Sequence, residues 1–145
     1  SDLYYLVGNH ENYDDMSTLR VDRIAHITVL SERRKPLREI KGYQQQRTFN
    51  VSQYVKEHIY MFGGESITVS FKAKRSIVNQ ILDWFDGNVE FSDVTPDDVV
   101  CRVRVNHHAF KYWALQYMQS VKVLSPASLV TEVKEAIKEG LQQYS

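Results

Sequence analysis

The feature that most constrains the fold is a regular change of apolar spacing between residues 66 and 145. Strict alternation, as in Ile67, Val69 and Phe71, predicts half-buried strands, whereas spacings of three and four residues predict amphipathic helices. The elements follow one another as strand, helix, strand, strand, helix, strand, with one more helix at the end, which is the split βαβ arrangement. The expected strands cover residues 67–72, 89–91, 99–105 and 121–124, and the expected helices cover 77–85, 107–117 and 126–141.

Capping residues support these helices. Asn106 precedes the second helix, and the last helix begins with Ser125 at its N-cap and Pro126 at its first position. A shorter helix is predicted over residues 51–62, with Asn50 or Ser52 as its cap and Gly63-Gly64 at its end.

The first part of the chain has a different pattern. Residues 3–7, 18–24 and 25–30 predict three further strands, and the segment between the first two is polar and turn-rich. Residues 31–46 are charged and rich in glutamine, and their basic run Arg33-Arg34-Lys35 predicts a tether between domains. We therefore expect one unit at residues 1–34, a linker with a short helix at 35–65, and a second unit at 66–145.

Composition limits the function. Lysine and arginine together number 18, as do aspartate and glutamate, so any binding of nucleic acid must come from a local patch. The single cysteine, Cys101, excludes an intrachain disulfide and fits a reducing cytosol. No signal peptide or run of about 18 apolar residues is present, so we expect a cytoplasmic protein with no membrane contact. The chain opens on a strand without Met, and we expect it to be a piece of a longer protein.

The second expected strand carries two arginines. Alternation would put Leu19, Val21 and Arg23 on one face. Arg20, Asp22 and Ile24 would lie on the other. In one interpretation Asp22 simply pairs with an arginine and both rims are solvated. In the other, arginines and the aromatic pair Tyr4-Tyr5 form a surface that receives an anion or a base, as in many single-strand-binding proteins.

At these residues the sequence resembles the WYL domain family of bacterial transcriptional regulators. Tyr4-Tyr5-Leu6 corresponds to the tripeptide that names the family, with Tyr in place of the usual Trp, and residues 19–24 correspond to its arginine-containing strand. Residues 121–126 and the helix after them resemble the close of the family's C-terminal extension. The resemblance implies an α+β protein: strands of a partial Sm-like small β-barrel, followed by a ferredoxin-like βαββαβ domain with an extra C-terminal helix.

The resemblance also implies a function, namely the effector-sensing and dimerisation part of a transcriptional regulator. The ligand would be single-stranded nucleic acid or a small anionic effector, and the partner a second copy of the chain. Duplex DNA would be contacted only through a helix-turn-helix domain upstream. Tyr4, Tyr5 and Leu6 would supply stacking or packing, Arg20 and Arg23 charge, and His10 a pocket wall. The alternative is a purely structural dimerisation module with no ligand of its own.

A second basic surface is expected on the C-terminal sheet. Arg102 and Arg104 alternate with the valines of their strand, and Ser70 and Lys72 lie on the strand predicted to pair with it. Helices cover one face of a split βαβ sheet, so these side chains should lie on the open face. They are either an ordinary solvated surface or a second surface that tracks phosphates or joins two subunits.

No residues suggest catalysis, a metal site or a cofactor, and we expect the protein not to be an enzyme. None of the five histidines has a cysteine or carboxylate at the spacing of zinc ligands, and Cys101 falls in the apolar phase of its strand. An Sm-like barrel has five strands, yet only three are predicted before the tether. An open sheet has unpaired edges, so we expect fraying or strand-mediated self-association of residues 1–30.

Overall fold

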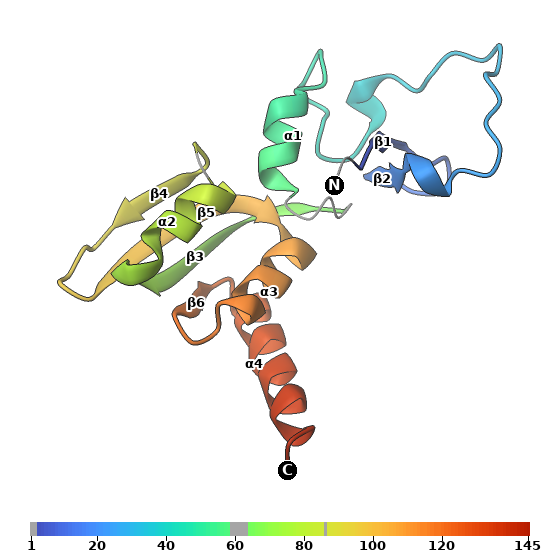
Figure 1. Ribbon diagram of the computed structural model, residues 1–145. Helices are drawn as coiled ribbons and strands as arrows, with labels where there is room; N and C mark the ends of the chain where they lie inside the picture. Colours follow the sequence, from blue (N-terminus) through green and yellow to red (C-terminus); the bar gives the residue numbers. More distant parts are fainter. Residues whose placement is uncertain (1–2, 59–63, 86) are drawn as a thin grey trace.

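The computed structural model describes residues 3–58, 64–85 and 87–145, and it has mixed α+β architecture with two separate antiparallel sheets (Figure 1). The first sheet has two strands, β1 (Tyr5–Asn9) and β2 (Met16–Arg20). The second sheet has four, β3 (Ser66–Lys74), β4 (Val89–Ser92), β5 (Asp98–Asn106) and β6 (Val121–Ser125). The helices are α1 (Val51–Glu57), α2 (Val78–Phe85), α3 (His107–Gln116) and α4 (Ala127–Gln142).

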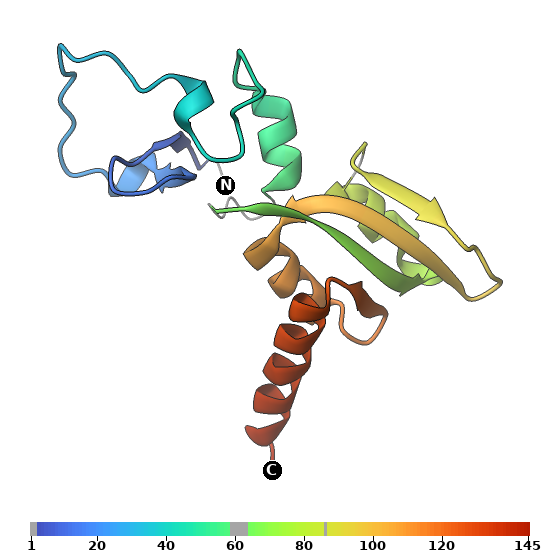
Figure 2. The same cartoon turned by 180° about the vertical axis from the view of Figure 1, so that it is seen from behind.

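The four-stranded sheet has the order β4-β5-β3-β6, with every neighbouring pair antiparallel. The chain passes through it as β3-α2-β4-β5-α3-β6, which is the predicted split βαβ arrangement, and α4 follows as the extra helix. In Figures 1 and 2, α4 leaves the body of the domain and ends at the C-terminus. The ferredoxin-like prediction is therefore confirmed in its element order.

The core lies between one face of this sheet and its helices. The inward residues of β3 and β5 include Phe71 and Cys101, which are fully buried against Ile81 and Phe85 of α2 and Trp113 of α3. Phe71 meets the ring of Trp113 edge-on at a centroid distance of 5.4 Å. Packing of this kind fixes the phase of both strands, so their alternate residues face away from the helices.

Local signals set the helix ends. The side chain of Asn106 accepts a hydrogen bond from the backbone N–H of Ala109, as predicted, and Asn50 caps α1 in the same way through the N–H of Gln53. The last helix starts later than expected, because Ser125 still belongs to β6 and Pro126 occupies the N-cap. The predicted helix over 51–62 is too long, because α1 ends at Glu57 with His58 as its C-cap. Of the expected stop Gly63-Gly64, only Gly64 lies within the described residues.

The N-terminal strands differ from the prediction. The second strand stops at Arg20, and Val21–Arg23 form a turn of 3-10 helix, so the expected alternation over residues 18–24 is wrong beyond Arg20. Residues 25–30 are not a strand at all. They are exposed, and Figure 1 shows the chain from this region to residue 36 as a long loop. The described N-terminal residues form a two-stranded hairpin and close no barrel.

A second, smaller core holds the hairpin to the segment that follows it. Met16 of β2 packs with Ile40 and Tyr54, and four partly buried side chains complete the group: Val7, Leu37, Tyr43 and Phe49. The hydroxyl of Tyr54 also forms a 2.7 Å hydrogen bond with that of Thr18. Residues 37–54 are therefore packed against one face of the hairpin, which we call its inner face.

Candidate functional site

The strand register divides the hairpin into two faces. Tyr5 lies opposite Arg20, and this pair shares a face with Val7 and Met16, which belong to the small core. Leu6 lies opposite Leu19 on the other face, where the two are 47% and 51% exposed. Of the six predicted site residues, the structure thus brings Tyr5 and Arg20 together on the inner face.

Asp22 forms an ion pair with Arg20. Arg20 donates from Nε and Nη2 to the two carboxylate oxygens, at 3.0 and 2.6 Å. These hydrogen bonds lower the pKa of Asp22 and raise that of Arg20. The pairing interpretation from the sequence is therefore confirmed. Both groups are open to solvent, so the forked contact remains available for exchange with another anion.

The remaining predicted residues lie apart. Tyr4 is 73% exposed and precedes β1, and Leu6 points to the outer face. Arg23 is carried by the 3-10 turn beyond β2. His10 follows the far end of β1, where its Nδ1 accepts a hydrogen bond from the N–H of Asn12. About four residues of strand, or roughly 13 Å, separate that end from Arg20.

A basic cleft lies beside the inner face. Its volume is about 1140 Å³, and Val7, Asn9 and Met16 of the hairpin form one wall. Its charged lining consists of Arg34, Lys35, Arg38 and Arg47, and the lining contains no aspartate or glutamate among the described residues. Phe49 and the glutamines at 44–46 complete it. A concave surface with one sign of charge concentrates field lines and attracts anions.

The sequence does not predict these cleft residues as part of the site. Its only signal is the basic run Arg33-Arg34-Lys35, which predicts a tether between domains. Arg38 and Arg47 lie in segments without apolar periodicity, so nothing in the sequence places them beside Arg34. The fold of residues 34–51 brings them together.

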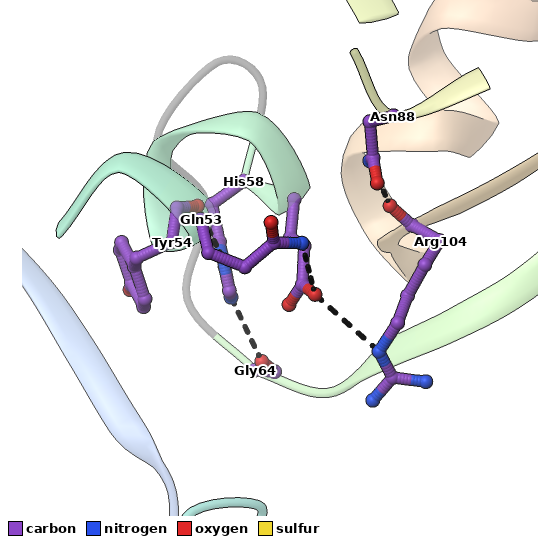
Figure 3. A network of polar contacts seen from close by, with 7 residues as sticks. Gln53, Tyr54, His58, Gly64, Asn88 and Arg104 are labelled. Carbon is purple, nitrogen blue, oxygen red and sulfur yellow. Dashed lines mark hydrogen bonds and ion pairs between the residues drawn. The ribbon is translucent and has the colours of Figure 1, made fainter. Parts of the chain in front are cut away.

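Helix α1 runs from the cleft toward the C-terminal sheet, and Figure 3 shows the polar contacts at its second end. Its first residue, Val51, lines the cleft. At its other end Glu57 lies 3.4 Å from Nε of Arg104 on β5 and accepts a hydrogen bond from Gln53. His58, which is buried, has Nδ1 at 2.8 Å from the carbonyl of Tyr54 and Nε2 at 3.3 Å from that of Gly64. We name this group of contacts the α1–β5 joint.

Residues 63–141 match the model of the WCX domain family, and this match covers more than half of the chain. The chain belongs to the WCX domain family. WCX domains are C-terminal domains associated with WYL domains, which agrees with the resemblance of the first thirty residues. No curated protein matches the chain.

The open face of the WCX sheet carries the predicted basic residues. Lys72, Arg102 and Arg104 are exposed, while Phe71, Cys101 and Val103 beside them in sequence are buried. The predicted strand phase is therefore confirmed. Arg104 takes part in the α1–β5 joint through Glu57, and the sequence did not indicate that contact.

Cys101 is part of the WCX core. It is fully buried, and burial raises the pKa of its thiol to about 11. A thiol in this environment stays protonated and fills space, as the sequence predicted.

Metal-ligating clusters and membrane-spanning helices are both absent from the part of the chain that the structure describes. No three or more histidine, cysteine, aspartate or glutamate side chains gather there in a way that could hold a metal ion. In the same residues, no helix is long and apolar enough to cross a membrane.

Proposed function

We propose that the chain is the effector-sensing and dimerisation part of a WYL-type transcriptional regulator. Its ligand would be single-stranded nucleic acid or another anionic molecule, bound along the inner face of the hairpin and in the basic cleft. The regulator would be a bacterial cytoplasmic homodimer that binds its promoter through a helix-turn-helix domain elsewhere. Membership of the WCX family supports the type of regulator.

The observation that carries the ligand class is the charge of the cleft. Arg34, Lys35, Arg38 and Arg47 line it, and no carboxylate among the described lining residues balances them. Phosphates would neutralise these side chains and release their counterions, which favours binding at low salt. Phe49 offers an aromatic ring in the same cleft, and Tyr5 and Arg20 extend the surface along the hairpin.

Among the residues first predicted, Tyr5, Arg20 and Arg23 have clear roles in this proposal. Arg20 would exchange Asp22 for a ligand phosphate, and Arg23 would add charge nearby. Tyr4, Leu6 and His10 would contact only a ligand that reaches around the edge or the turn of the hairpin.

The alternative function is a dimerisation module without a ligand. The outer face of the hairpin favours it, because Leu6 and Leu19 are about half exposed there and Val21, in the adjoining 3-10 turn, is exposed to a similar extent. Paired apolar side chains on an open sheet are suited to contact with a second copy.

Equilibrium titration of a labelled single-stranded oligonucleotide distinguishes these functions. The sensing proposal predicts saturable binding that weakens as salt is added. It also predicts a clear loss of affinity in the variant Arg38→Gln with Arg47→Gln, and none in Lys134→Gln with Lys138→Gln on α4. A dimer that shows no saturable binding at low salt would leave the structural module as the function.

A further inference from the structure

The open face of the WCX sheet has an excess of positive charge. This face is the one opposite the helices, because Phe71, Cys101 and Val123 are buried on the face that the helices cover. The basic residues on the open face are Lys72, Lys74, Arg102, Arg104 and Lys122, and the carboxylates are Glu90 and Asp98.

Two of these cations lie directly opposite each other. Lys72 of β3 pairs in register with Lys122 of β6, and both are exposed. Like charges at directly opposed positions destabilise a sheet. Within the described residues, no carboxylate oxygen lies within ion-pair distance of either lysine. The sheet itself offers no stabilising reason for this pair.

The basic residues form a diagonal across the sheet. Lys122 lies opposite Lys72, and Arg102 lies opposite Ser70, two residues farther along β3. Arg104 continues the line opposite Thr68, with Glu57 of α1 at 3.4 Å from its Nε. Glu90 of β4 lies opposite Arg102, so a phosphate would compete with a carboxylate at each arginine of the line. With about 3.4 Å per residue and about 4.8 Å per strand, this track spans roughly 17 Å. We call Lys72, Lys122, Arg102 and Arg104 the open-face track.

The open face suits a backbone rather than bases. The residues that its described strands direct outward are lysines, arginines, serines, Thr68, two carboxylates and the aliphatic Val100 and Leu124, with no aromatic ring on which a base could stack. A second copy of the same face would bring like charges together, which argues against dimerisation here.

We propose that the open-face track docks the phosphate backbone of duplex nucleic acid without reading its sequence. A duplex strand carries about one charge per 3.4 Å of axis, so several phosphates fall within the length of the track. This proposal is independent of the cleft and its ligand. It departs from the expectation that duplex DNA is contacted only through an upstream helix-turn-helix domain, although promoter recognition stays with that domain because phosphate contacts carry no sequence information.

The test compares three forms of the chain on a mixed-sequence 20-base-pair duplex. Lys72→Gln with Lys122→Gln removes the opposed pair, and Lys134→Gln with Lys138→Gln is the control of equal charge on α4. Anisotropy titrations over a series of salt concentrations should give wild type and control the same slope of log affinity against log salt. The open-face variant should have a slope smaller by about 1.8, or about 0.9 for each phosphate that is no longer neutralised.

Further arms make the result decisive. A second duplex of unrelated sequence should bind equally well, and the cleft variant Arg38→Gln with Arg47→Gln should keep its duplex binding. The open-face variant should melt no lower than wild type, since the change removes two opposed like charges. The proposal is overturned if the open-face variant and the α4 control bind alike, if wild type binds no duplex at low salt, or if the open-face variant dissociates from a dimer instead.

Discussion

Glu57 at the end of α1 lies 3.4 Å from Nε of Arg104 on β5, and this contact joins the segment that lines the basic cleft to the WCX sheet. The Glu57 side chain is only 15% exposed, while that of Arg104 is 55% exposed. The pair is thus partly screened by solvent, and its contribution to stability should be modest.

Removing this ion pair should loosen α1 more than the WCX core. We expect Glu57→Gln to lower the free energy of unfolding by about 0.5 kcal/mol in urea titrations. The same change in an Arg104→Gln background should have a smaller effect, because the partner is already gone. Equal effects in both backgrounds would show that the two side chains do not interact.

The WCX core should be intolerant of truncation. Phe71 is fully buried and its ring meets those of Phe85, Phe110 and Trp113. Phe71→Ala should cost about 3–5 kcal/mol of stability, measured by chemical denaturation. Leu124→Ala on the open face is the control, and it should change stability far less. A cost below about 1 kcal/mol for Phe71→Ala would contradict this assignment of the core.

Stability should depend on pH through the contact between α3 and α4. Nε2 of His107 pairs with a carboxylate oxygen of Glu132, and this hydrogen bond lowers the pKa of Glu132 from its ordinary value of 4.5. A depressed carboxyl pKa adds stability above the unfolded value, and that stability is lost as pH falls through the folded value. Thermal melts should therefore lose a small increment below about pH 4.5, and Glu132→Gln should remove that increment. Wild type and Glu132→Gln melting in parallel from about pH 6 to about pH 3 would rule this out.

Arg20 and Arg23 should each contribute charge to ligand binding. Arg20→Ala and Arg23→Ala should weaken single-stranded oligonucleotide binding, and each phosphate left without its arginine should reduce the salt slope by about 0.7. Asp22→Asn is the informative partner, because it frees the guanidinium of Arg20 and should tighten binding. Anisotropy at two ionic strengths measures all three. Wild-type affinity in both arginine variants would remove the hairpin from the site.

The hairpin should be the least protected part of the described chain. It has two strands, and of their residues only Met16 is buried, while the others are half-buried or exposed. Hydrogen exchange should therefore be fast over residues 3–30 and slow over the WCX strands, unless the hairpin pairs with a second copy. Light scattering distinguishes these cases. A monomer that protects both regions equally would mean that the small core holds the hairpin as firmly as the WCX core holds its sheet.

The fold of residues 66–145 could be predicted because apolar period, capping by Asn106 and element order all agree. The loop at 25–30 could not, since Ile27, Val29 and Leu30 have strand-like residue types. In the structure they are 76%, 95% and 66% exposed, and no described strand pairs with them. Residue type indicates strand propensity, but a partner strand decides whether a strand forms.

The sequence indicates only part of the arrangement at the candidate site, for a similar reason. Tyr5 and Arg20 are brought together by a short-range hairpin register, which alternation can indicate. Arg34, Arg38 and Arg47 lie in a segment whose sequence has no apolar periodicity. Only the folded chain shows that they line one cleft.

Hydrogen exchange of the chain with and without a short single-stranded oligonucleotide at low salt tests directly whether the basic cleft is the ligand site. If the cleft binds the oligonucleotide, protection should rise at residues 34–49 and along β1 and β2. It should not rise over α4, and the added protection should disappear in Arg38→Gln with Arg47→Gln. Saturable binding without new protection at residues 34–49, or protection that survives in that variant, would contradict the proposed site.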